Sequence, residues 1–198
     1  MGATASKKYR RYRRLLTRAW TATAPQTIRP GDIIKIKLQD ADGDWANHWA
    51  LCDHIDQFGH VYCYHVVTDD RDLDKDVTRR ALVRYETLER IIYSKGHHSS
   101  AEPARYRVAN QRRLARKVLW TVGRQVPEWQ DLAADLEQLP GQYVDYHWKT
   151  RNEEHYCTHW RYAIGWSTDV YTDHQIVDKT IDQMAILTRR TTAKEVAG

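Results

Sequence analysis

Residues 150–166, TRNEEHYCTHWRYAIGW, place amide, acid and thiol side chains together at the start of a predicted helix. Asn152 is a favourable N-cap, which puts Glu153 in the first turn, where the partial positive charge of a helix N-terminus stabilises an anion. Cys157 follows four residues later on the same helix face. A thiol acts as a nucleophile when a nearby base and a helix N-terminus stabilise its thiolate. The segment therefore offers a carboxylate at the helix N-terminus and a thiol one turn beyond it.

The three cysteines are few and irregularly spaced, which predicts free thiols and neither a disulfide framework nor a Cys-x-x-Cys metal site. Cys157 would lie about 5–6 Å beyond Glu153 along the helix axis, away from the terminus that lowers the pKa of a thiol. We expect Cys157 to be buried and inert, with a nucleophilic Cys157 as the alternative. Cys63 shares a strand face with His65 and is also expected in the core.

An antiparallel sheet is predicted to position these side chains. Alternating apolar and polar residues indicate strands at 32–39, 48–55 and 60–67, with turns at 40–47 and 56–59 between them. Three further segments have less decisive patterns: residues 81–88 suit a strand or a short helix, residues 104–110 are β-like, and residues 142–149 suit a short extended segment.

Two more helices are predicted outside the first segment. Residues 111–123 place Leu114 and Val118 on an apolar stripe, with Gly123 as the C′ residue, and residues 173–190 have helical apolar spacing. The opposite face of the first of these helices is basic and is expected to be solvated: Arg112, Arg113, Arg116 and Lys117. The predicted fold class is α+β, an antiparallel sheet with packed helices.

Four sequence blocks, in this order, carry a family resemblance: RPGDIIKIK (29–37), NHWALCDHI with VYCYHVV (47–67), ARYRVAN (104–110) and NEEHYCTHWRYAIG (152–165). They resemble the lecithin:retinol acyltransferase-like (LRAT-like) family, including the H-box/NC phospholipase A/acyltransferases and the related viral H-box/NC proteins. The resemblance implies a permuted papain-like, NlpC-type fold for a domain over residues 29–198 that ends in the amphipathic helix.

The same resemblance implies a catalytic triad and shows where this chain departs from it. His48 matches the family's general base and His65 the residue that orients it, whereas Glu153 stands where the family has its acyl-accepting cysteine. A carboxylate is a weak nucleophile towards an ester, and the mixed anhydride that it would form replaces a thioester poorly. We therefore expect a pseudoenzyme that binds a phospholipid or an as yet unidentified protein.

Three alternatives remain open from the sequence. One is an active phospholipid acyltransferase or phospholipase A that uses Cys157 or another residue. The second is a metal site, because two imidazoles and a carboxylate from His48, His65 and Glu153 could bind Zn²⁺ or Fe²⁺, although no metal or other cofactor is expected. The third is RNA binding through the basic N-terminal arm.

Residues 1–28 are predicted to form a basic, lipidated arm. MGATAS fits the myristoylation pattern at Gly2, and a basic run follows it: Lys7, Lys8, Arg10, Arg11, Arg13, Arg14 and Arg18. One myristoyl chain anchors only marginally, whereas each basic residue near an anionic leaflet adds about 1 kcal/mol. The formal net charge is +5, so the rest of the chain is slightly acidic. With no apolar run long enough to cross a bilayer and no apolar secretory signal, we expect a cytoplasmic protein at an anionic membrane surface.

Overall fold

The computed structural model describes residues 28–39, 45–68, 77–95 and 105–183. Gly2, the seven cations of the arm and the end of the predicted C-terminal helix (184–190) lie outside these ranges.

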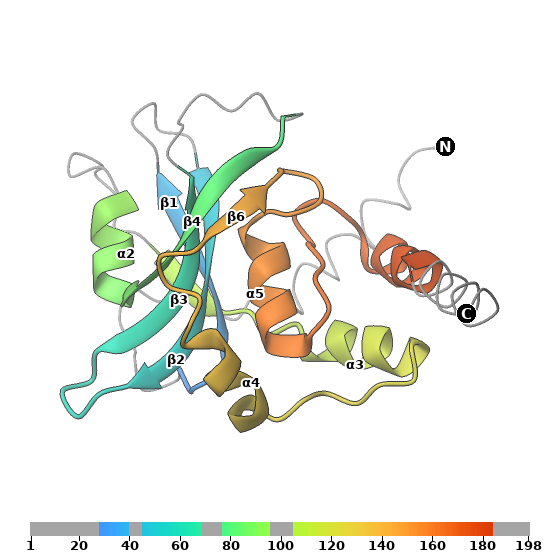
Figure 1. The fold of residues 1–198 in the computed structure, drawn as a ribbon, viewed down its shortest axis with the longest axis horizontal. Helices are drawn as coiled ribbons and strands as arrows, with labels where there is room; N and C mark the ends of the chain where they lie inside the picture. Colours follow the sequence, from blue (N-terminus) through green and yellow to red (C-terminus); the bar gives the residue numbers. More distant parts are fainter. Residues whose placement is uncertain (1–27, 40–44, 69–76, 96–104, 184–198) are drawn as a thin grey trace, which may run out of the picture.

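One six-stranded antiparallel sheet organises the described residues, in the order β5-β1-β2-β3-β4-β6 (Figure 1). Its strands are β1 (Ile33–Gln39), β2 (Trp45–Ile55), β3 (Val61–Thr68), β4 (Arg79–Thr87), β5 (Arg105–Val108) and β6 (Tyr143–Tyr146). The helices are α2 (Leu88–Lys95), α3 (Arg112–Thr121), α4 (Trp129–Leu136), α5 (Glu153–Tyr162) and a helix over residues 173–183. The predicted α+β class with an antiparallel sheet is confirmed.

Strand alternation divides the core between the two faces of the sheet. On one face, residues such as Trp49, Leu51 and Tyr64 pack with side chains of α3, α4 and α5. On the other face, Ala50 and Cys63 belong to a second cluster that includes the buried residues of α2. Figure 1 shows α2 and α5 on opposite sides of the sheet. The period-2 pattern predicted from the sequence therefore corresponds to two separate apolar layers.

The sheet opens between β2 and β3. Pairing of these two strands runs from Ala50↔His65 to Ile55↔Val61. Beyond that point β2 continues against β1 as far as Gln39↔Trp45, and β3 continues against β4 as far as Thr68↔Ala81. The two halves of the sheet thus separate just beyond His65, and His48 lies on the separated part of β2. This opening gives the N-terminus of α5 access to histidines that belong to the sheet.

Several boundaries differ from those predicted. Strand β2 begins at Trp45, inside the segment 40–47 that was predicted as a turn, because it continues to pair with β1. The ambiguous segment 81–88 lies mostly in β4, which runs directly into α2. Helix α4 was not predicted, because only Leu136 among its residues is buried and its apolar pattern is short.

Candidate functional site

The N-terminus of α5 is fixed by the cap that the sequence predicted. The Asn152 side chain accepts a hydrogen bond from the His155 backbone N–H at 3.1 Å, and His155 Nδ1 accepts one from the Asn152 N–H at 3.3 Å. This reciprocal capping box satisfies two backbone donors and sets the direction in which the chain enters the helix. Glu153 is therefore held at the first turn of α5, beside the opening between β2 and β3.

The structure brings the three family-triad positions together in series. Glu153 Oε1 lies 3.7 Å from His48 Nδ1, and His48 Nε2 lies 3.0 Å from His65 Nδ1. The two imidazole rings are nearly perpendicular, with an interplanar angle of 87°. His65 Nε2 then faces Glu86 Oε2 at 3.3 Å. We call Glu153, His48, His65 and Glu86 the acid–histidine array; it runs from α5 across β2 and β3 to β4.

Glu86 is the member of this array that the sequence analysis missed. It pairs with Cys63 in the β3–β4 ladder, so it projects on the same face as His65 two residues along. Arg84 and Arg90 lie 3.6 Å and 3.5 Å from its carboxylate. Glu86 lies beside His65 because of the register in which β4 pairs with β3. The local sequence pattern of residues 81–88 does not specify that register.

The donor and acceptor roles of the two imidazoles depend on which ring nitrogens carry protons. His48 Nδ1 and His65 Nε2, the two ends of the pair, lie 3.7 Å and 3.3 Å from carboxylate oxygens, and each could carry a ring proton, although neither contact has hydrogen-bond geometry. If both rings were neutral with those protons in place, two lone pairs would face each other across the 3.0 Å gap between His48 Nε2 and His65 Nδ1. One additional shared proton makes that contact a hydrogen bond. A neutral pair also forms this hydrogen bond when only one of the two end nitrogens carries a proton, so the 3.0 Å contact is compatible with both protonation states.

Glu153 is held as an anion. Burial opposes its ionisation, but the interaction with His48 and the hydrogen bond from Tyr146 Oη, at 3.0 Å from Oε2, leave its pKa below the ordinary value. The pKa of Tyr146 is raised, by burial and then by the Glu153 charge, so the phenol stays a donor. His48 and His65 are 4% and 1% exposed, whereas the Glu153 side chain is 18% exposed. The carboxylate is thus the part of the array nearest to solvent.

Cys157, the alternative nucleophile, lies in the hydrophobic core at 1% exposure. Burial raises the pKa of its thiol well above the usual value, and the charges of Glu153 and Glu154 raise it further. Cys52 and Cys63 are also buried, and burial raises the pKa of both. Each thiol therefore has an environment that opposes formation of the thiolate.

Glu154, next to the triad position, is fully buried and was not singled out by the sequence analysis. Its carboxylate accepts hydrogen bonds from four donors: Gln111 Nε2, Thr168 Oγ1, Ser167 Oγ and the Asp169 backbone N–H. Burial and the neighbouring Asp169 charge raise its pKa. Glu154 thereby joins the first turn of α5 to the chain that leaves the same helix.

Asp169 extends this connection to the sheet. It lies 2.5 Å from Lys35 Nζ on β1, and it accepts hydrogen bonds from Trp49 Nε1 at 2.9 Å and Asn47 Nδ2 at 3.2 Å. The Lys35 ammonium also lies 4.6 Å from the Trp49 ring centroid. Residues 167–169 therefore hold α5 against the part of β2 that carries His48.

The geometry is unlike that of a metal centre. His48 uses its two ring nitrogens towards different partners, so the array is linear and its nitrogens do not converge with Glu153 on one point. Across the described ranges, no group of three or more His, Cys, Asp or Glu side chains is arranged to hold a metal ion. His60, which precedes β3, pairs with Asp56 at 2.9 Å in an exposed turn and is not part of the array.

No protein-family model and no curated protein matches the sequence. The resemblance to the LRAT-like family therefore rests on the four sequence blocks alone. Among the described helices, none is long and apolar enough to span a bilayer.

Proposed function

We propose that this chain is a membrane-associated protein with a permuted papain-like, LRAT-like domain that has lost acyl-transfer chemistry and acts by binding lipid or protein. The observation that carries the proposal is the contact between His48 Nδ1 and the Glu153 carboxylate, in the place of a histidine–thiol pair. A general base needs a free lone pair towards the nucleophile. Here that nitrogen lies 3.7 Å from a carboxylate whose pKa is lowered, so near neutral pH Glu153 carries no proton for His48 to accept.

The other side chains near the site support the same conclusion. Glu153 is held ionised by His48 and Tyr146, and an ionised carboxylate that attacked an ester would yield an anhydride more reactive than the ester itself. Within the described residues, no histidine is recorded in contact with Cys157. Burial also raises the pKa of its thiol, which opposes formation of the thiolate. The opening in the sheet remains, and Glu153 is partly exposed there, which suits binding without turnover.

The proposal is tested by restoring the sulfur. The wild-type chain, incubated with labelled phosphatidylcholine, is expected to release no fatty acid and to form no acyl adduct. Glu153→Cys is expected to place a thiol beside His48 and to react rapidly with iodoacetamide near neutral pH. Glu153→Cys combined with His48→Ala is the matched control, which keeps the thiol but removes the base.

Two results would overturn the proposal in different ways. Wild-type turnover that is abolished by His48→Ala or Cys157→Ala would show that chemistry remains. A Glu153→Cys thiol that reacts no faster than the double variant would show that His48 is not placed as the family's base, which would remove the basis for an LRAT-like site.

A further inference from the structure

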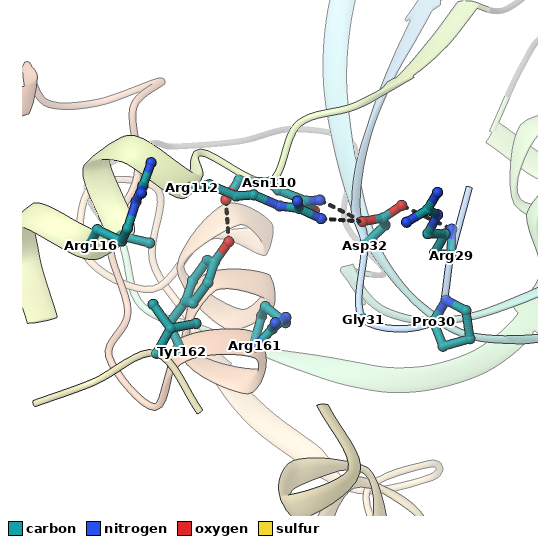
Figure 2. Close-up of a pocket in the computed structure, with 11 residues that line it drawn as sticks. Arg29, Pro30, Gly31, Asp32, Asn110, Arg112, Arg116, Arg161 and Tyr162 are labelled. Atoms are coloured by element: carbon teal, nitrogen blue, oxygen red, sulfur yellow. Dashed lines mark hydrogen bonds and ion pairs between the residues drawn. The ribbon is translucent and has the colours of Figure 1, made fainter. Parts of the chain in front are cut away.

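A cavity of about 430 Å³ lies beside the C-terminal end of α5, where Arg161 and Tyr162 line it (Figure 2). Glu153 and Tyr162 are the first and last residues of α5, so the two regions are about 14 Å apart along the helix axis. Four arginines from three parts of the fold line the cavity: Arg29 from the loop before β1, Arg112 and Arg116 from α3, and Arg161 from α5. The basic face of α3 was expected to be only solvated, but two of its four cations line this cavity.

Asp32 is the acidic residue of the cavity wall, and it is already engaged. One oxygen accepts a hydrogen bond from the Arg29 backbone N–H at 2.9 Å; the other accepts one from Asn110 Nδ2 and lies 3.8 Å from the Arg112 guanidinium. Figure 2 shows these contacts meeting at Asp32. Four guanidinium groups against one carboxylate leave an excess of three positive charges around the cavity.

One arginine of the cavity is held by contacts within the protein, whereas two others have guanidinium donors that a ligand could use. Arg161 Nη1 donates to the Pro127 carbonyl at 2.9 Å, and its guanidinium lies 5.1 Å from the Tyr162 ring centroid. Arg29 and Arg116 are exposed, and within the residues that the structure describes their guanidinium groups have no recorded hydrogen bond or ion pair. Their donors are therefore available to a ligand in the cavity.

The N-terminus of α3 adds to the positive potential at this cavity. Its N-cap residue, Gln111, has a left-handed backbone with φ of 50° and forms no side-chain capping bond, and the first turn contains no acidic residue. The first turn instead begins with Arg112, a cation at the positive end of the helix dipole, which is unfavourable without an anion nearby. A bound anion would offset both the dipole and the arginine charges.

We propose that this cavity binds a phosphorylated small molecule or lipid headgroup through its phosphate group. The guanidinium group of arginine can bind two phosphate oxygens at once. A phosphomonoester carries about −1.5 to −2 charges near pH 7, so it offsets more of the cavity's three excess positive charges than a single carboxylate would. The cavity volume lies in the range typical of small-molecule sites, about 300–1,000 Å³. The site is independent of the proposed function, because it uses neither the acid–histidine array nor the N-terminal arm.

Arg116→Gln and Arg29→Gln test the site, with Arg113→Gln as the matched control. Arg113 is an exposed neighbour on α3 that does not line the cavity, so its replacement removes the same charge from the same helix. Calorimetry with glycerol 3-phosphate measures a soluble phosphate ester. Flotation with phosphatidylcholine vesicles, with and without phosphatidic acid, measures a headgroup. All chains carry Gly2→Ala, so that myristate does not dominate vesicle binding.

Arg116→Gln and Arg29→Gln are each expected to weaken phosphate binding about tenfold, while Arg113→Gln changes it less than about twofold. If the two cavity variants lose binding to both probes, the ligand is a lipid headgroup. If they lose binding to glycerol 3-phosphate alone, the ligand is a soluble phosphate ester. The site is disproved if neither probe distinguishes the cavity variants from Arg113→Gln, or if the wild-type chain binds neither probe. Equal melting temperatures for the three variants exclude misfolding as the cause of lost binding.

Discussion

Two replacements of the buried Glu154 should differ in their loss of stability, because they leave different numbers of buried donors without a good acceptor. In Glu154→Gln, the amide oxygen can take the place that accepts from Ser167 and the Asp169 N–H. The amide NH₂ then faces Thr168, whose hydroxyl can turn to accept, and Gln111, whose amide cannot turn because its oxygen accepts from Trp166 Nε1 at 2.6 Å. The rigid Gln111 donor then keeps only its long contact of 3.5 Å with Thr168 Oγ1, at a cost of about 1–3 kcal/mol.

Glu154→Ala leaves more donors unsatisfied. The Gln111 amide and the Asp169 backbone N–H are both fixed and cannot turn as the Ser167 and Thr168 hydroxyls can; the amide keeps only its 3.5 Å contact with Thr168 Oγ1. Two rigid buried donors correspond to a loss of about 4 kcal/mol in the free energy of unfolding, a large fraction of the stability of a typical domain. The alanine variant should therefore lose at least about twice as much stability as the glutamine variant.

Urea unfolding followed by circular dichroism measures both differences, provided that the m-value stays constant. Glu137→Gln, an exposed change of the same kind, is the control and should fall within about 0.5 kcal/mol of wild type. If Glu154→Ala lies within about 1 kcal/mol of wild type, or is no worse than Glu154→Gln, the four hydrogen bonds do not hold α5 to residues 167–169 and this reasoning is wrong.

Three further predictions follow from the site and the arm. The pKa of Glu153 is lowered from its ordinary value of 4.5, so the stability that it contributes is fully present above that pH and is lost as pH falls through the folded-state pKa; melting curves of Glu153→Gln should show a smaller loss on acidification than wild type. All three cysteines are buried, so the native chain should leave Ellman's reagent unreacted until it is unfolded, and one rapidly reacting native thiol would favour the Cys157 enzyme. Gly2→Ala should move the protein from membrane to soluble fractions in cells, and unchanged partitioning would refute the myristate anchor.

The sequence predicted the parts of the site that depend on local chemistry. Asn152 has the side chain of an N-cap, so the start of α5 and the first-turn position of Glu153 followed directly. The strands that carry His48 and His65 were identified by their alternation, although the beginning of β2 was placed three residues late. The resemblance, and not periodicity, placed these two histidines with Glu153, and the structure brings all three together.

The missing parts depend on contacts between distant residues. Glu86 joins the array through the register of β3 against β4, and a shift of one residue would point it to the other face of the sheet. Glu154 and Asp169 form a network with β1 and β2, and neither lies in a periodic pattern that distinguishes a buried acid from a solvated one. The arginine cavity likewise combines a loop, α3 and α5, which no local stretch reveals.

A carboxylate at residue 153, where the resemblance to the LRAT-like family implies a thiol, limits what the acid–histidine array can do. A thiol needs a neutral imidazole to take its proton, so a catalytic pair alternates between two protonation states. With carboxylates at both ends, Glu153 and Glu86 place negative charge on both sides of the histidine pair. That fixed charge pattern lies where β2 and β3 separate, and it joins α5, β2, β3 and β4 through contacts of 3.0 to 3.7 Å. These contacts join four elements at the point where the sheet splits, and the two histidines, at 4% and 1% exposure, are the buried members of the array.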